Sequence, residues 1–154
     1  MKSVFFYDSD IGKIGIAEDG QAITNIFFEK EEAVNFEVLE TPLIKEAHKQ
    51  FEEYINGKRK FFDLPIYPSG TEFQQKVWNA LKDIPYGETR SYKDIALAVG
   101  NEKACRAVGM ANNKNPISII IPCHRVIGKN GKLVGYGGGL PIKEYLLKLE
   151  KENI

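Results

Sequence analysis

The chain has 154 residues, of which 43% are hydrophobic and 27% charged, so it can bury a substantial core as one ordinary domain or two small ones. It contains no apolar run long enough to cross a membrane and no signal-peptide pattern after Met1, which predicts a cytoplasmic protein without membrane contact. Two cysteines and two histidines are too few for a typical four-ligand zinc site, and no disulfide is expected in a reducing compartment.

Charge is unevenly divided along the chain, although the net charge is zero. Residues 1–70 contain 8 Lys/Arg against 13 Asp/Glu, whereas residues 71–154 contain 13 against 8. No acidic residue lies between Glu102 and Glu144, where seven basic residues occur. Such a run is often only a solvated face. Here it surrounds Cys123 and predicts a positive field suited to phosphates.

The first half of the chain has the pattern of a small antiparallel sheet followed by one helix. Segments 4–7, 11–17 and 22–28 are rich in β-branched and aromatic residues and are separated by turn-forming Asp, Ser and Gly residues. Thr41-Pro42 then predicts the start of a helix that runs from Leu43 to Ile55, with apolar residues at helical spacing.

A linker is predicted after this helix. Residues 58–70 contain two prolines, which is typical of a segment between two units. We therefore predict an N-terminal α/β domain with its linker over residues 1–69 and a mainly helical domain over residues 70–154. The predicted fold class is α+β.

The second domain is predicted to contain a helix-turn-helix. Thr71-x-x-Gln74 and Ser91-x-x-Asp94 are capping patterns that start two helices, and Asn101 is expected to cap a third helix from Glu102 to Asn113. Two short helices joined at a glycine form this motif, which also occurs in proteins that do not bind DNA.

The third helix is predicted to have two distinct faces. The inward stripe consists of small apolar residues: Ala104, Ala107, Val108 and Ala111. The outer face carries residues at three- and four-residue steps: Lys103, Arg106, Met110 and Asn113. This outer face is suited to lie on DNA.

Cys123 is the candidate reactive residue. Ile119–Ile121 is predicted to form a short buried strand that ends at Pro122, because proline lacks the N–H needed to continue a ladder. His124 and Arg125 follow directly, and neighbouring cationic groups can lower the pKa of a thiol until it is a thiolate at neutral pH. The alternative is that Cys123 is a small buried hydrophobic residue and His124 an ordinary surface residue.

A glycine-rich region and a closing helix complete the chain. Segments 128–131 and 135–139 can approach a ligand through backbone N–H groups, but they match neither a P-loop nor a dinucleotide-binding fingerprint, so no cofactor is expected. The helix after Pro141 carries Glu150 near its end, either as a surface residue or as the partner that orients His124.

The sequence around Cys123 resembles the O6-alkylguanine-DNA alkyltransferases. The similarity extends from Gly70 to Glu150 and rests on Arg106-Ala107-Val108-Gly109, Asn115-Pro116, Ile119-x-Ile121-Pro122-Cys123-His124-Arg125-Val126 and Tyr136-x-Gly138-Gly139-Leu140. The N-terminal domain resembles the family's ribonuclease-H-like domain in its order of strands and helix. It lacks cysteine, so the zinc site of some family members is not expected, and no metal is predicted.

The resemblance implies a role for each residue at the reaction centre. Cys123 would accept the alkyl group, His124 would act as base through a bridging water, and Glu150 would orient His124. Tyr92 would lie by the flipped nucleotide and give a proton or a hydrogen bond to guanine N3. Asn115 would tie the recognition helix to the Cys123 loop.

The resemblance also implies how DNA and the base are held. Arg106 would fill the space that the flipped base leaves in the duplex. The remaining predicted DNA contacts are Tyr92, Lys103, Met110, Asn113, Lys114 and Arg125. The substrate pocket would be formed by Val126, Tyr136 and Gly137. Some relatives have serine at position 137, so a hydroxyl contact to O6 would be lost here while a backbone N–H donor remains.

The implied activity is DNA repair by a monomer that transfers the alkyl group of O6-alkylguanine, and also of O4-alkylthymine, from double-stranded DNA to Cys123, once per molecule. Two other classes fit part of the pattern. A cysteine hydrolase also needs Cys, His and a carboxylate, but it does not explain an outward arginine on a helix-turn-helix. A non-catalytic lesion sensor or regulator explains that helix, but it has no need of Cys123.

Overall fold

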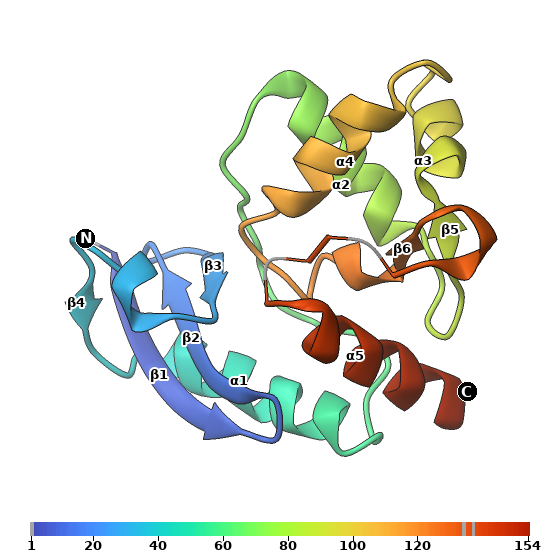
Figure 1. Ribbon diagram of the computed structural model, residues 1–154. Helices are drawn as coiled ribbons and strands as arrows, with labels where there is room; N and C mark the ends of the chain where they lie inside the picture. The colour runs from blue at the N-terminus through green and yellow to red at the C-terminus, as the bar shows by residue number, and fades with distance from the viewer. Residues whose placement is uncertain (1, 134, 137) are drawn as a thin grey trace. The chain divides into compact units, whose positions relative to one another are not determined.

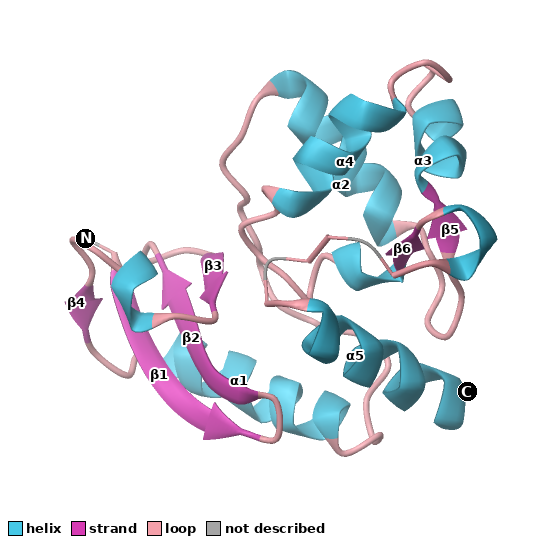
Figure 2. Cartoon of the chain, viewed as in Figure 1, coloured by secondary structure: helices cyan, strands magenta, loops and turns pink. Residues whose placement is uncertain are grey.

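The structure is a computed structural model that describes residues 2–133, 135–136 and 138–154 (Figure 1). The chain divides into two compact units, Met1–Ser69 and Gly70–Ile154. No helix among the described residues is long and apolar enough to cross a membrane. The α+β fold class is confirmed, with a sheet in the first unit and mainly helices in the second (Figure 2).

The sheet of the first unit has the order β3-β2-β1-β4. The three predicted strands are present as β1 (Ser3–Ser9), β2 (Gly12–Glu18) and β3 (Ile23–Phe27), and they pair antiparallel. Strand β4 (Glu37–Val38) was not predicted; it pairs with β1 in parallel and makes the sheet mixed. Two residues are too few to show the alternation by which strands are recognised.

Helix α1 (Pro42–Ile55) covers one face of this sheet. It begins one residue before the predicted Leu43, because the Thr41 hydroxyl accepts a hydrogen bond from the Ile44 N–H at 3.2 Å and Pro42 occupies the first turn. Tyr7 of β1 stacks on His48 of α1 with ring centroids 3.6 Å apart. Alternate residues of β1 and β2 therefore face α1, and the intervening ones face the other side.

The segment predicted as a linker is attached to the first unit. The Gln50 amide donates to the Asp63 carbonyl at 3.1 Å and accepts from the Asp63 N–H at 2.8 Å. Ile23 of β3 bonds through its backbone to Pro65 and Tyr67, each at 2.8 Å. These bonds satisfy part of the β3 edge, which would otherwise present open donors and acceptors.

The second unit contains helices α2 (Glu72–Lys82), α3 (Tyr92–Ala98), α4 (Cys105–Asn113) and α5 (Leu140–Glu152). Both predicted capping boxes are present, at Thr71 and at Ser91. Helix α4 begins three residues later than predicted, because the Asn101 side chain accepts from the Lys103 N–H in a local turn instead of capping the helix.

Helices α2 and α4 are joined through a buried tryptophan. Trp78 of α2 is 1% exposed, and its Nε1–H donates to the Ala111 carbonyl of α4 at 2.9 Å. This bond satisfies the only polar atom of the indole, so the ring can lie fully in the core. A short parallel pair, β5 (Arg90–Ser91) with β6 (Val126–Ile127), links the start of α3 to the residues after Cys123.

Candidate active site

Cys123 follows a tight turn, not a strand. The prediction of a strand at Ile119–Ile121 is wrong, although Ile119 and Ile121 are buried as expected. Ile119 has φ 76°, in the left-handed region that a β-branched residue rarely occupies, and the Ile121 N–H donates to the Ile117 carbonyl at 2.9 Å. Three consecutive aliphatic residues are typical of a buried strand. The sequence does not reveal the hydrogen bonds that close the turn here.

The side chain of Asn115 closes this turn. Its amide nitrogen donates to the Ile121 carbonyl at 2.8 Å, and its oxygen accepts from the Ile117 N–H at 2.9 Å. Pro122 then forms an inverse γ-turn with φ −79° and ψ 65°, in which the Cys123 N–H donates to the Ile121 carbonyl at 2.8 Å. Cys123 thus begins the short 3₁₀ helix η2 (Cys123–Arg125).

The Cys123 thiol is buried, with only 2% of the residue exposed. Burial raises the pKa of this thiol, and hydrogen bonds from Asn115 and Ser118 and the charge of Lys143 oppose the rise only in part. Its Sγ lies 3.9 Å from the Ser118 hydroxyl. The prediction that His124 and Arg125 lower the thiol pKa is therefore wrong, and the resting site holds a protonated thiol.

His124 and Glu150 form a buried pair. His124 Nε2 lies 2.7 Å from the Glu150 carboxylate, and the two side chains are 0% and 1% exposed. Burial lowers the pKa of His124, and the neighbouring carboxylate compensates only in part. Burial alone would raise the pKa of Glu150, but hydrogen bonds from His124 and Arg125 lower it to about 2.

These pKa shifts define the protonation of the pair. Glu150 is a carboxylate and His124 is neutral at neutral pH, so Nε2 carries the hydrogen that Glu150 accepts. Nδ1 is then the basic nitrogen of the ring. The pair is the arrangement in which a carboxylate fixes the tautomer and orientation of a general base.

Arg125 is a structural residue, and its assignment to the DNA-binding set is wrong. The guanidinium donates to Glu150 at 2.8 and 3.0 Å and to the Ile84 carbonyl at 2.7 Å, and only 7% of the residue is exposed. It also lies over the Tyr86 ring, 5.6 Å from its centroid. These bonds fix the side chain inside the unit.

Lys143 also belongs to this site, although it was not predicted from the sequence. It is 0% exposed, and its Nζ donates to the Gly135 carbonyl at 3.3 Å. Burial lowers the pKa of Lys143, and the negative charge of a Cys123 thiolate would raise it. A signal was available, because Lys143 shares the inner face of α5 with Leu146 and Glu150 at steps of three and four residues.

Two tyrosines lie in the same region of the second unit. Tyr92 begins α3, and its ring packs against Gly109 of α4. Burial raises the Tyr92 pKa, and a thiolate at Cys123 would raise it further, so its hydroxyl stays protonated. Burial also raises the pKa of Tyr136 well above its ordinary value. Val126 is buried beside η2, whereas Gly137 lies outside the described residues.

The outer face of α4 is exposed as predicted. Its exposed residues include Lys103, just before the helix, and Arg106, Met110, Asn113 and, at the C-cap, Lys114. Ala107 is also exposed, so its predicted inward position is wrong, and Ala104 is half-buried. The inner face consists of Val108, Ala111 and Asn112.

Asn112 connects this inner face to the reactive residue. It is 2% exposed, and its side-chain nitrogen lies 3.4 Å from the Cys123 carbonyl. Asn112 was not predicted, because nothing local distinguishes it from the exposed Asn113. One helix therefore presents a polar surface outward and holds the Cys123 main chain on its inner side. The part of the chain that the structure describes contains no group of three or more His, Cys, Asp or Glu side chains that could hold a metal.

Both units match known protein families. Residues 5–68 match the family described as "6-O-methylguanine DNA methyltransferase, ribonuclease-like domain", and residues 72–152 match "6-O-methylguanine DNA methyltransferase, DNA binding domain". The chain belongs to the 6-O-methylguanine DNA methyltransferase family. The resemblance that was inferred from the motifs around Cys123 is confirmed.

Relatives match over nearly the whole chain. A methylated-DNA–protein-cysteine methyltransferase of Methanosarcina acetivorans is 54% identical over 148 residues, covering 94% of this chain and 95% of that protein. A constitutive methylated-DNA–protein-cysteine methyltransferase of Bacillus subtilis is 51% identical over 152 residues, covering 94% and 92%.

Solved structures show the same fold. The crystal structure of Mycobacterium tuberculosis O6-methylguanine methyltransferase has a TM-score of 0.93 and 43% identity and covers 100% of this chain and 95% of that one. The M. tuberculosis OGT structure in complex with DNA has a TM-score of 0.91 and 45% identity, covering 98% of this chain and 94% of that one.

The structural role of Arg125 can be tested by Arg125→Met. This change leaves Glu150 buried without its main counter-charge, so we expect the free energy of unfolding, measured in urea, to fall by about 3–5 kcal/mol. Arg106→Ala, on the exposed face of α4, is the control and should change it by less than about 0.5 kcal/mol. An Arg125 variant of unchanged stability that loses only DNA affinity would return Arg125 to the DNA interface.

The effect of Lys143 on the thiol can be tested by Lys143→Met. Removing a buried cation from the neighbourhood of Cys123 should raise the thiol pKa, so the pH profile of Cys123 alkylation by iodoacetamide should move to higher pH. Alkylation at pH 7 should become slower, because the thiolate fraction falls as the thiol pKa rises. Lys148→Met, at an exposed position of the same helix, should leave the profile unchanged. Identical profiles for both variants would show that Lys143 does not act on the thiol.

Proposed function

We propose that this protein repairs DNA by transferring the alkyl group of O6-alkylguanine, and also of O4-alkylthymine, to Cys123, once per molecule. The observation that carries the proposal is the position of Cys123. Asn112, on the inner face of α4, and Asn115, just after that helix, bond to the loop that holds Cys123. His124 follows Cys123 directly and is paired with Glu150. The names of the relatives and the DNA-bound M. tuberculosis structure support the same activity.

The reaction begins with a buried thiol, so it needs a base. In the proposed step, His124 Nδ1 takes the thiol proton through a bridging water while Glu150 keeps the ring oriented. The thiolate sulfur then attacks the alkyl carbon on O6. A sulfur–carbon bond forms, the carbon–O6 bond breaks, and its electron pair stays on the guanine. Lys143 stabilises the thiolate during this step because its buried ammonium acts at low dielectric.

The departing guanine anion needs a proton. Tyr92 is the proposed donor to guanine N3, and its raised pKa keeps the hydroxyl protonated at neutral pH. The imidazolium formed on His124 returns a proton to Tyr92 through water, so the net result is that the thiol hydrogen ends on guanine. The proposed pocket for the base is formed by Val126, Tyr136 and Gly137, the last of which lies outside the described residues.

A base inside a duplex cannot reach a buried thiol, so the proposal requires base flipping, which costs a few kcal/mol. The exposed face of α4 is the proposed DNA surface, with Lys103, Met110, Asn113 and Lys114 around Arg106. Arg106 fills the vacated space in the stack. The reacting residues and this face lie in one unit of one chain, which supports action as a monomer.

Intact-mass measurement tests the activity directly. After incubation with excess duplex containing O6-methylguanine, the protein mass should rise by one methyl group, mapped to Cys123, and repaired guanine should reach a plateau at one equivalent. A thioether contains no acyl bond that water can cleave, so the thiol is not regenerated. Cys123→Ser should bind the duplex without transfer. Repeated turnover would instead favour a hydrolase, and binding without any transfer by the unaltered protein would favour a lesion sensor.

The role of Arg106 is tested by comparing two substrates. Arg106→Ala should slow transfer from duplex DNA at least about tenfold more than reaction with free O6-benzylguanine, because only the duplex requires flipping. Lys114→Ala, on the same face, should instead weaken binding at every sequence and reduce the salt slope by about 0.9 if one phosphate contact is lost. If Arg106→Ala slowed the reaction equally on both substrates, the proposed role of Arg106 in filling the space of the flipped base would be ruled out.

A further inference from the structure

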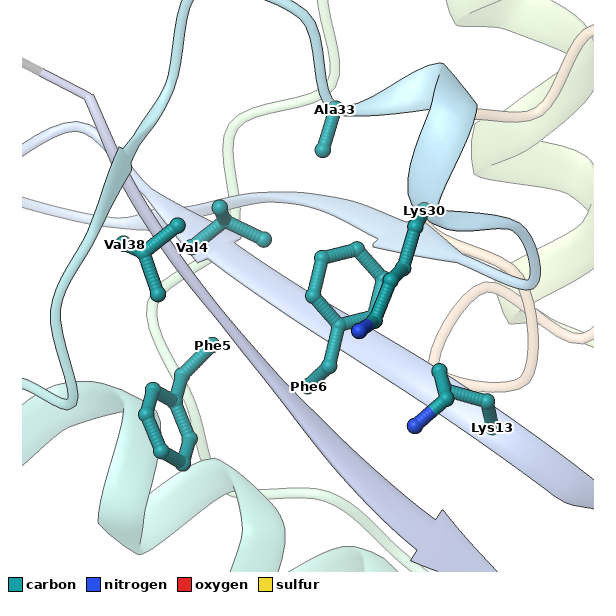
Figure 3. Close-up of a pocket in the computed structure, with 7 residues that line it drawn as sticks. All are labelled: Val4, Phe5, Phe6, Lys13, Lys30, Ala33 and Val38. Carbon is teal, nitrogen blue, oxygen red and sulfur yellow. The ribbon is translucent and has the colours of Figure 1, made fainter.

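We propose that a cavity in the first unit binds a small amphipathic anion with a flat apolar body, such as an aromatic carboxylate. The cavity has a volume of about 430 Å³, and its lining side chains other than Phe5 lie on the sheet face opposite α1 (Figure 3). Its lining residues are Val4, Phe5, Phe6, Lys13, Lys30, Ala33 and Val38. This site is separate from Cys123 and does not depend on the proposed transfer reaction.

The cavity arises from the register of the sheet. Phe6 of β1 pairs with Gly15 of β2, and a Cβ at Gly15 would collide with the Phe6 ring, so the ring lies across the neighbouring strand. The chain after β3 crosses above this face through η1 (Lys30–Glu32), and Ala33 and Phe36 pack on an apolar cluster that includes Val4. Ala33 has a short side chain, so space remains between this covering segment and the sheet.

The charged residues that line the cavity are both basic. Among the described residues that line the cavity, two are lysines from different elements, Lys13 of β2 and Lys30 of η1, and none is acidic. Lys13 has an ion pair with Asp8 at 3.2 Å, but the two side chains are 41% and 91% exposed, so the pair is weak and an incoming anion can compete for Lys13. The surrounding sequence is acidic, with 13 Asp/Glu against 8 Lys/Arg in residues 1–70, so composition alone does not explain a basic cavity.

The lining determines the chemistry of the occupant. Val4, Phe6, Ala33 and Val38 offer apolar contact for a flat body, and the two ammonium groups suit one carboxylate. A neutral apolar molecule would gain nothing from either ammonium group, and a cation would be repelled. A bicyclic acid of about 13 non-hydrogen atoms fits the volume and is expected to bind in the millimolar range.

The test is a titration of the full chain with 2-naphthoate and with 2-naphthamide, which have the same shape and differ in charge. Methyl NMR signals of Val4, Ala33 and Val38 should shift with 2-naphthoate and saturate at one equivalent. The neutral amide should bind about tenfold more weakly or not at all, because an ammonium–carboxylate pair at a partly exposed site changes affinity by a factor on the order of ten. Equal binding of acid and amide, or no saturable shift with either, would overturn the proposal.

Three variants locate the site. Lys30→Glu reverses one charge of the lining, Ala33→Leu fills the cavity, and Lys49→Glu makes the same charge change at an exposed position of α1. Naphthoate affinity should fall about tenfold or more in Lys30→Glu and in Ala33→Leu and stay unchanged in Lys49→Glu. Loss in Lys49→Glu to the same extent would indicate a general charge effect, and retention in both cavity variants would place binding elsewhere; either result overturns the assignment.

Discussion

The carboxylate of Glu150 is the group on which the second unit depends. It accepts from His124 and Arg125 of η2 and from the Gly87 N–H in the turn after α2, so one side chain of α5 connects three segments. A buried carboxylate without such partners would take up a proton or destabilise the fold. The same bonds keep it ionised, and an ionised Glu150 is what fixes the tautomer of His124. The stability of this unit and the proposed role of His124 as a base therefore depend on the same carboxylate.

Residues of two helices, α4 and α5, surround the Cys123 loop, and each helix contributes a different kind of contact. Asn112 and Asn115, in α4 and just after it, bond to the main chain of the Cys123 loop, while Lys143 reaches the region from α5. The pKa of the thiol is raised by burial and moderated by these neighbours, so reactivity depends on packing rather than on exposure. Because α4 also carries the exposed face that is proposed to bind DNA, the proposed DNA contact and the positioning of the sulfur involve the same helix.

The features that the sequence predicted correctly are those fixed by neighbouring residues. Capping boxes at Thr71 and Ser91 are local hydrogen-bond patterns, and strand alternation in the first unit is visible in any short window. Arg125 was misassigned because its partner, Glu150, lies 25 residues away, and a charged residue is ordinarily exposed. Lys143 was missed because a lysine is ordinarily exposed, although its spacing from Leu146 and Glu150 on α5 is visible in the sequence. The turn at Ile119 was misassigned because Asn115 closes it across intervening residues, an interaction that no periodicity reveals.

That turn also affects how the unfolded chain behaves. Ile117-Ser118-Ile119-Ile120-Ile121 has high β-propensity and no charge, the composition of segments that pair with identical segments of other molecules. In the folded protein, Ile117, Ile119 and Ile121 are buried in a closed loop that offers no strand edge. Pro116 and Pro122 flank the stretch and limit how far a ladder could extend. The conformation that presents Cys123 thus also buries a segment that could start aggregation in the unfolded chain.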